Sequence, residues 1–160
     1  HTASRLVLHI PEGGANLEGV LGCRDIIQET SNDFDYIFVA QGTSTTSLGI
    51  CMAMATQSKL IVVPVLKGFD GLREMKNLAK NANLSIDFSR VEVLRDYHFG
   101  GYAKSNKGLN EFVKTFNREH KFNIEQIYTG KVMFAMQDYL GSVKGNKKAL
   151  FVHTGGLYHL

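Results

Sequence analysis

The sequence is poor in the residues that build metal centres and disulfides. Its 160 residues contain two cysteines, Cys23 and Cys51, which have no partners at metal-ligand spacing. Each falls in a predicted helix, so we interpret both as small apolar residues of a cytoplasmic, reducing environment. His98 and His153 have no Asp or Cys partner at ligand spacing. These patterns indicate neither a metal site nor a nucleophilic triad.

Clustered positive charge and long apolar runs are lacking too. The net charge of +3 is dispersed, and Lys147-Lys148 is the longest basic run. We therefore expect no nucleic-acid partner and no membrane partner. No signal-peptide pattern and no membrane-spanning stretch is visible. The hydrophobic content of 44%, without internal repeats or Pro-rich linkers, predicts one α/β domain over residues 1–160 with a substantial core.

The most informative stretch runs from Asp35 to Gly49. Residues 36–40 are apolar and predict a buried strand, which ends at Gly42 and a run of hydroxyl side chains: Thr43, Ser44, Thr45, Thr46 and Ser47. Residues 46–56 are apolar nearly all round and predict a buried helix. The free N–H groups and positive dipole end of such a helix favour an anion. One hydroxyl would satisfy an ordinary N-cap, so a run of five favours phosphate binding.

The rest of the chain alternates between strand and helix patterns. Further strands are predicted at 5–10, 60–66, 91–94, 124–128 and 150–154, and further helices at 17–29, 70–83, 108–120 and 132–140. We expect Asn16 to cap the first helix, and Pro64 to lie near a strand end or an unpaired edge. This alternation predicts a three-layer α/β fold, with a mostly parallel sheet covered by helices on both faces.

Ligands of such sheets bind outside the carboxyl ends of the strands. Polar, glycine-bearing loops follow the predicted strands at 11–14, 42–46, 97–104, 128–131 and 153–156. A single glycine pair in such a loop is usually only a turn. Because all these loops would lie along one edge of the sheet, together they predict a binding site there.

The motifs in these loops resemble one enzyme family in content and order. They are Pro-Glu-Gly-Gly-x-Asn at 11–16, Gly19-x-x-Gly22, Gly-Thr-x-x-Thr-x-x-Gly at 42–49, Asp-Tyr-His-Phe-Gly-Gly-Tyr at 96–102, Tyr-Thr-Gly-Lys at 128–131 and His-Thr-Gly-Gly at 153–156. They resemble the 1-aminocyclopropane-1-carboxylate deaminase and D-cysteine desulfhydrase family. The resemblance implies a pyridoxal 5'-phosphate enzyme with the tryptophan synthase β-like fold.

The resemblance covers only the C-terminal half of that family. The other half carries the Schiff-base lysine and a Ser-Asn pair for the substrate carboxylate. Together with the start at His1, this predicts a truncated or processed portion of a longer enzyme, inactive by itself and homodimeric at full length.

The resemblance also implies roles for individual residues. Residues 42–46 would bind the cofactor phosphate, although Ser44 and Thr45 stand where the family commonly has glycine. Thr154 would lie beside the pyridine nitrogen, where a hydroxyl gives a weaker electron sink than a carboxylate. Thr129 is also expected at the cofactor and favours the desulfhydrase-like branch, because the deaminases have glutamate there.

Tyr128 and Tyr102 would line the substrate side and act on protons. The alternative for each is a tyrosine that only packs at a strand end. Lys131 is not expected to be the cofactor lysine and could be a solvated residue at a helix start. Glu12 could be catalytic, but a structural hydrogen bond explains it equally well.

The predicted function is therefore that of a pyridoxal-phosphate-dependent deaminase or lyase acting on a small amino acid, with release of ammonia and a 2-oxo acid. Two alternatives remain open. A phosphosugar-binding module also uses a Ser/Thr-rich loop between a strand and a buried helix, and a non-catalytic structural domain would need no ligand.

Overall fold

A computed structural model describes residues 9–31 and 33–156. These residues contain a four-stranded sheet in which all neighbouring strands are parallel, in the order β3-β2-β1-β4. The strands are β1 (Tyr36–Gln41), β2 (Lys59–Pro64), β3 (Val91–Val93) and β4 (Ala149–Phe151).

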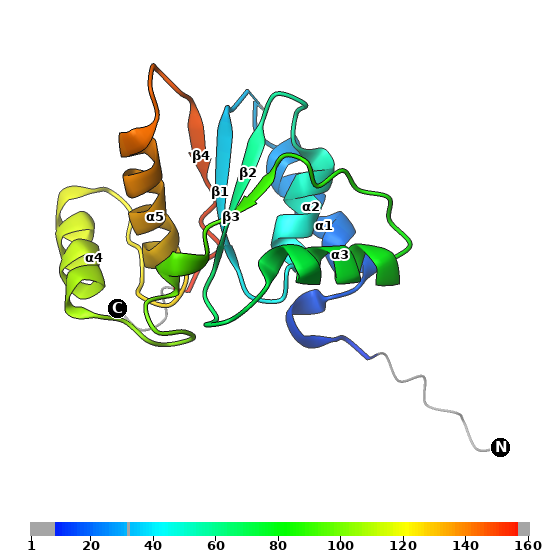
Figure 1. The fold of residues 1–160 in the computed structure, drawn as a ribbon, viewed down its shortest axis with the longest axis horizontal. Helices are drawn as coiled ribbons and strands as arrows, with labels where there is room; N and C mark the ends of the chain where they lie inside the picture. The colour runs from blue at the N-terminus through cyan, green and yellow to red at the C-terminus, as the bar shows by residue number, and fades with distance from the viewer. Residues whose placement is uncertain (1–8, 32, 157–160) are drawn as a thin grey trace.

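Helices cover both faces of this sheet (Figure 1). One face carries α1 (Leu17–Gln28), α2 (Thr45–Ala53) and α3 (Gly71–Asn81). The other carries α5 (Thr129–Ser142), with α4 (Lys107–Glu119) packed against the outside of α5. Two short 3₁₀ helices, η1 (Glu12–Gly14) and η2 (Arg95–His98), lie in the connections. The predicted three-layer α/β fold with a parallel sheet is confirmed.

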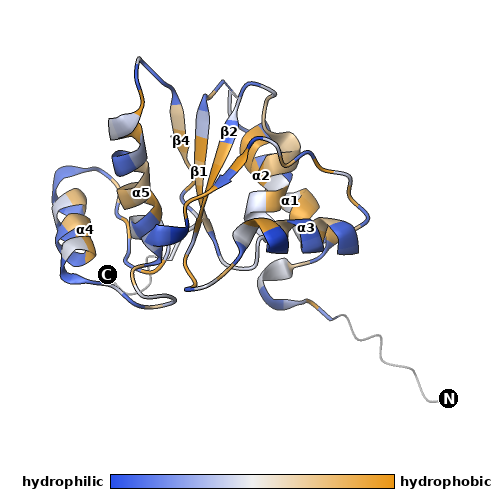
Figure 2. Cartoon of the chain, in the orientation of Figure 1, coloured by the Kyte–Doolittle hydropathy of each residue, from blue (hydrophilic) through white to orange (hydrophobic). Residues whose placement is uncertain are grey.

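The two faces of β1 explain how the chain builds two apolar layers. Ile37 and Val39 pack towards the α1–α3 side, whereas Phe38 and Ala40 pack towards α5. All four are buried, because successive side chains of a strand point to opposite faces. Figure 2 shows the apolar strands between the helices, with hydrophilic residues prominent on α3 and on parts of α4 and α5.

Helix ends follow the local sequence signals. Asn16 caps α1 by accepting a hydrogen bond from the Gly19 N–H at 2.9 Å, as predicted. The helix predicted at 108–120 is α4, and its apolar stripe is buried at Leu109, Val113 and Phe116. None of the helices within the described residues is both long enough and apolar enough to cross a membrane.

Some predictions of strands were wrong or fall outside the described residues. Residues 124–128 do not form a strand, and 126–128 form a turn. The predicted strand at 5–10 lies largely outside the described residues, and His9 and Ile10 are not in a strand. Pro64 is the last residue of β2, near a strand end as predicted. The next residue, Val65, donates its N–H to Gln41 O at 3.1 Å, so the ladder resumes after the proline.

Polar contacts of Glu92 link two strands of the sheet to α5. Lys59 Nζ and Glu92 Oε2 are 2.6 Å apart, and we call this contact the β2–β3 ion pair. The Tyr139 hydroxyl of α5 also donates to Glu92 Oε2, at 2.9 Å. These bonds connect β2, β3 and α5 at a partly exposed position.

Candidate functional site

A cavity of about 690 Å³ lies beyond the carboxyl ends of β1 and β2. Each of the predicted loops contributes to its lining: Glu12, Gly13, Gly42, Thr43, Ser44, Thr45, Thr46, Ser47, Tyr102, Tyr128 and Thr154, together with Ala40, Val65, Leu66 and Phe69. The strand order changes direction between β1 and β4, and such a switch point is where parallel sheets bind ligands. The expected gathering of these loops is confirmed.

Residues 42–46, which we call the hydroxyl loop, lead into and begin α2. Ser44 is the N-cap residue, but its side chain makes no capping hydrogen bond. The first N–H groups of a helix have no partner within the helix, so they are available to a ligand. Hydroxyls surround this helix end, and Thr43 Oγ1 and Thr45 Oγ1 lie 3.2 Å apart. This set of donors fits an anion such as a phosphate group.

Ser44 is held in an unusual conformation. Its φ of 72° and ψ of −4° are left-handed, a region that glycine adopts more easily than serine. Two hydrogen bonds fix the residue, because its carbonyl accepts from Ser47 Oγ at 3.0 Å and its Oγ accepts from Gln41 Nε2 at 2.8 Å. With its oxygen engaged as an acceptor, the Ser44 hydroxyl can still donate its own hydrogen.

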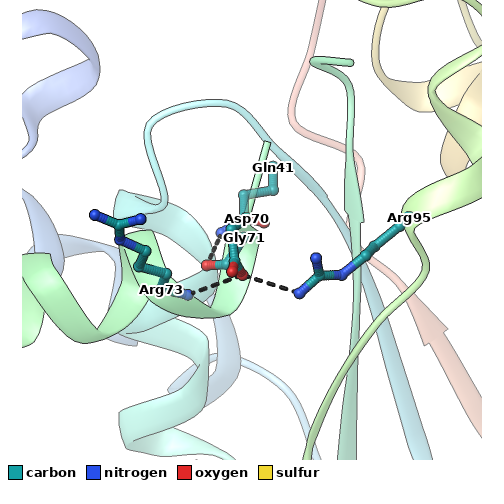
Figure 3. A network of polar contacts seen from close by, with 5 residues as sticks. All are labelled: Gln41, Asp70, Gly71, Arg73 and Arg95. Atoms are coloured by element: carbon teal, nitrogen blue, oxygen red, sulfur yellow. Dashed lines mark hydrogen bonds and ion pairs between the residues drawn. The ribbon is translucent and has the colours of Figure 1, made fainter. Parts of the chain in front are cut away.

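Gln41 connects the hydroxyl loop to the start of α3 (Figure 3). Its Nε2 also donates to Gly71 O at 2.9 Å, and the side chain is 1% exposed. A Cβ on Gly71 would lie 2.0 Å from Gln41 Oε1, so only glycine fits beneath this amide. Asp70 caps α3 through the Arg73 N–H at 3.3 Å and accepts from the Arg95 guanidinium at 3.0 Å (Figure 3). These bonds link the ends of β1 and β3 around α3.

Tyr102 and Tyr128 meet at the edge of the cavity. Their ring centroids are 6.0 Å apart, and the planes are inclined at 70°. Burial, followed by the hydrogen bond with Tyr102, raises the pKa of Tyr128 to about 12. Tyr128 therefore keeps its proton at neutral pH and acts as a hydrogen-bond donor. Its ring also lies 3.7 Å from the position that a Cβ on Gly42 would occupy, so Tyr128 lies beside the hydroxyl loop.

Thr154 and Thr129 have different positions. Thr154 follows β4, lines the cavity and is exposed. Thr129 is fully buried and is not among the lining residues. Its Oγ1 accepts from the Glu125 N–H at 2.9 Å and donates to Glu125 Oε1 at 3.0 Å. All the other predicted site residues line the cavity, and Thr129 supports the turn behind it.

Glu125 is a structural residue that the sequence reading missed. Its carboxylate accepts from the N–H groups of Ile127 at 2.5 Å, Tyr128 at 2.8 Å and Thr129 at 2.7 Å. The carboxylate thereby satisfies N–H donors at the beginning of α5, and its negative charge is stabilised by the positive end of the helix dipole. An acidic residue four positions before the helix was the available signal. This contact also explains why residues 124–128 turn instead of forming a strand.

Comparison with known proteins supports the resemblance inferred from the motifs. No family model matches the chain. Proteins named "putative 1-aminocyclopropane-1-carboxylate deaminase" from Pyrococcus furiosus and Pyrococcus horikoshii are each 30% identical, over 162 and 159 residues respectively. Both alignments cover 92% of this chain and 49% of the relative. A crystal structure described as an ACC deaminase homologue matches with a TM-score of 0.77 and 26% identity, over the same shares. The predicted family resemblance is confirmed.

The chain thus spans about half the length of the curated 1-aminocyclopropane-1-carboxylate deaminase relatives that it matches. Among the described residues, no group of three or more His, Cys, Asp or Glu side chains is placed to hold a metal ion.

Lys131 lies in the first turn of α5. The alternative of a solvated lysine was wrong, because Lys131 is fully buried. Its Nζ donates to His98 O at 2.9 Å and to Gly101 O at 2.8 Å. Burial lowers the pKa of this ammonium group, although Glu125 acts in the opposite direction. Lys131 is not among the residues that line the cavity.

The Pro-Glu-Gly-Gly motif lies against the hydroxyl loop. Glu12 and Gly13 both line the cavity. Gly13 has a φ of 60°, and a Cβ there would lie 2.2 Å from Thr43 Oγ1. Glycine is therefore required at 13 by both its backbone conformation and its contact with Thr43.

Proposed function

We propose that residues 1–160 are the C-terminal portion of a pyridoxal-phosphate-dependent deaminase or lyase. The substrate would be a small amino acid, of the D-cysteine or 1-aminocyclopropane-1-carboxylate kind, and the products would be ammonia and a 2-oxo acid. The observation that carries this proposal is the hydroxyl loop at the start of α2, which opens into the same cavity as Tyr128 and Thr154. The family resemblance supports it independently.

The phosphate would be bound by Gly42, Thr43, Ser44, Thr45 and Thr46. The N–H groups in the first turn of α2 supply donors without side-chain charge. The Ser44 hydroxyl is pre-oriented by Gln41 Nε2, so little ordering is needed on binding. The helix dipole adds about 0.3–1 kcal/mol for an anion at this position.

Thr154 and Tyr128 would serve the other end of the ligand. When bound, pyridoxal phosphate supplies an electron sink for charge that develops on the amino acid. Thr154 would hydrogen-bond the ring nitrogen, and we assign this contact to Thr154 alone because the Thr129 hydroxyl is bonded to Glu125. Tyr128, with its proton retained, would donate a hydrogen bond or a proton on the substrate side, with Tyr102 beside it.

The Schiff-base lysine would come from outside residues 1–160. No lysine lines the cavity within the described residues, and Lys131 Nζ is bonded to two carbonyl groups. The match to half of each relative is consistent with this division. We therefore expect the chain by itself to bind the cofactor without turning over D-cysteine or 1-aminocyclopropane-1-carboxylate.

The proposal is tested by ligand binding to the chain and to matched threonine variants. Calorimetry would compare pyridoxal phosphate with pyridoxal, which lacks the phosphate group. We expect the phosphate to be required, and Thr46→Val to weaken binding by about tenfold, since hydrogen bonds to charged groups are the stronger ones. The control is Thr115→Val, at an exposed position on α4 outside the cavity. This control should leave binding unchanged.

Borohydride reduction followed by intact mass separates the outcomes. The proposal expects phosphate-dependent binding without a stoichiometric adduct on one lysine. An adduct on Lys131 would show a complete cofactor site within this chain and contradict the proposed division. Equal binding of pyridoxal and pyridoxal phosphate would contradict the assignment of the phosphate loop. Binding of sugar phosphates, with no binding of pyridoxal phosphate, would contradict the enzyme proposal and select the phosphosugar alternative.

A further inference from the structure

Lys131 is a buried cation with a defined set of partners. It lies in the first turn of α5 and is 0% exposed. Its Nζ donates to the carbonyl oxygens of His98, the last residue of η2, and of Gly101, in the segment between η2 and α4. The lysine therefore ties the beginning of one helix to a loop about 30 residues earlier.

Packing alone does not explain an ammonium group at this position. Burying a charge is costly unless it is hydrogen-bonded, and a cation in the first turn of a helix faces the positive end of the dipole. A methionine would fill a similar volume without either cost. The distinctive property of Lys131 is thus its ability to donate to carbonyls on the neighbouring segment.

The two carbonyls that Lys131 contacts also organise consecutive turns. Gly101 N donates to His98 O at 3.0 Å, and Lys104 N donates to Gly101 O at 3.1 Å. Each oxygen therefore accepts one bond from its own turn and one from Lys131. Tyr102 lies in the second of these turns, directly after Gly101.

The same lysine is also close in sequence to the other tyrosine of the cavity. Tyr128 is the N-cap residue of α5, three positions before Lys131. The rings of Tyr102 and Tyr128 are in edge contact at 6.0 Å. Tyr102 is 54% exposed, so its own packing provides limited restraint.

We propose that Lys131 is a positioning residue that fixes the contact between Tyr102 and Tyr128. Its ammonium group donates hydrogen bonds to the carbonyls of His98 and Gly101 and so keeps Tyr102 against Tyr128 at the cavity. Lys131 is not among the residues that line the cavity, so we assign it no contact with a ligand. The inference rests on the proposed function only for the use of the tyrosines, and the arrangement itself exists without ligand.

The test is carried out on the ligand-free chain with Lys131→Met. Ring-labelled tyrosine NMR would detect the contact between Tyr102 and Tyr128, with Tyr102→Phe and Tyr128→Phe used to assign the signals. We expect the contact in the wild type and its loss in Lys131→Met. The matched control is Lys114→Met, which removes an exposed lysine from α4 and should retain the contact. A purely structural role would lower stability while leaving the rings together.

Hydrogen exchange provides the second measurement. The Gly101 and Lys104 amides should be protected in the wild type and should exchange about tenfold faster or more in Lys131→Met, because a charge-assisted bond on each acceptor is lost. A folded Lys131→Met that keeps both the ring contact and the protection overturns the proposal.

The wild-type data decide the matter if Lys131→Met does not fold. Protected Gly101 and Lys104 amides, together with the ring contact, support the fixed arrangement, whereas exchange at the rate of an open loop overturns it. Failure of pyridoxal phosphate to bind would contradict the proposed function and leave these ligand-free results unaffected. The two hypotheses can therefore fail separately.

Discussion

The left-handed conformation of Ser44 leads to a prediction about its replacement by two small residues. Ser44→Gly and Ser44→Ala both remove the hydroxyl that accepts from Gln41 Nε2. They differ only in the Cβ, which is unfavourable at a φ of 72°. A left-handed conformation costs a non-glycine residue roughly 1–2 kcal/mol, and the greater freedom of glycine in the unfolded chain offsets about 0.5–1 kcal/mol. We expect Ser44→Gly to be more stable than Ser44→Ala by about 0.5–1 kcal/mol.

Substitutions of Ser47 provide a matched pair of variants for which the opposite order of stability is expected. It is buried like Ser44, lies only three residues further along, and belongs to the regular helix α2. In a helix interior, alanine is favoured over glycine by about 1 kcal/mol. Ser47→Ala should therefore be more stable than Ser47→Gly, the reverse of the order at Ser44.

Urea unfolding of the four variants measures both differences. With a slope of about 2 kcal/mol per molar, the glycine variant at 44 should unfold about 0.3–0.5 M later than the alanine variant. At 47, the glycine variant should unfold about 0.5 M earlier than the alanine variant. The reasoning is refuted if alanine is as stable as glycine at position 44. Alanine as the more stable residue at both positions would mean that Ser44 has no special backbone conformation.

Three further predictions test other contacts of the site and sheet. Glu125→Ala leaves buried N–H groups at the start of α5 without their acceptor, so thermal or urea unfolding should show a loss of about 1–3 kcal/mol. Gly13→Ala, whose Cβ would overlap the Thr43 side chain, should lower stability by about 1–3 kcal/mol. Gly22→Ala, in a helix with open space, should raise stability by about 0.5–1 kcal/mol, and equal effects at 13 and 22 would contradict the packing argument. In the β2–β3 ion pair, burial opposes ionisation of Glu92, but hydrogen bonds from its lysine and tyrosine partners outweigh it and lower the pKa of Glu92. The stability advantage of the wild type over Glu92→Gln should thus be present near pH 6 and shrink as the pH falls below about 4, and an advantage that grows with acid would refute this.

Helices and strands with a regular pattern of apolar residues were predictable, because the spacing of those residues along the sequence decides which side chains are buried. The stripe of α4 and the apolar strand β1 occupy the predicted regions. The predicted boundaries differ from the structure by a few residues, as at α5, which begins at Thr129 and not at 132. Its first turn is stabilised by Glu125, a contact that periodicity does not encode.

Residues 124–128 show how a tertiary contact can override local propensity. Ile124 is fully buried in the cluster of α4 and α5, so its apolar character is used without a strand. Glu125 then accepts the N–H groups of the following turn. In a strand, the Glu125 carboxylate could not accept hydrogen bonds from these N–H groups, and the turn is therefore favoured.

The sequence by itself determined the alternation of strands and helices, the family resemblance and the set of loops that line the cavity, because these depend on residue spacing and on the rule that parallel strands end at a common edge. Only the tertiary structure decided that Thr129 faces Glu125 and that Lys131 is buried against the carbonyls of His98 and Gly101. A side chain's direction and partners depend on segments distant in the chain, and a buried polar group takes whichever partner the fold brings within hydrogen-bonding distance.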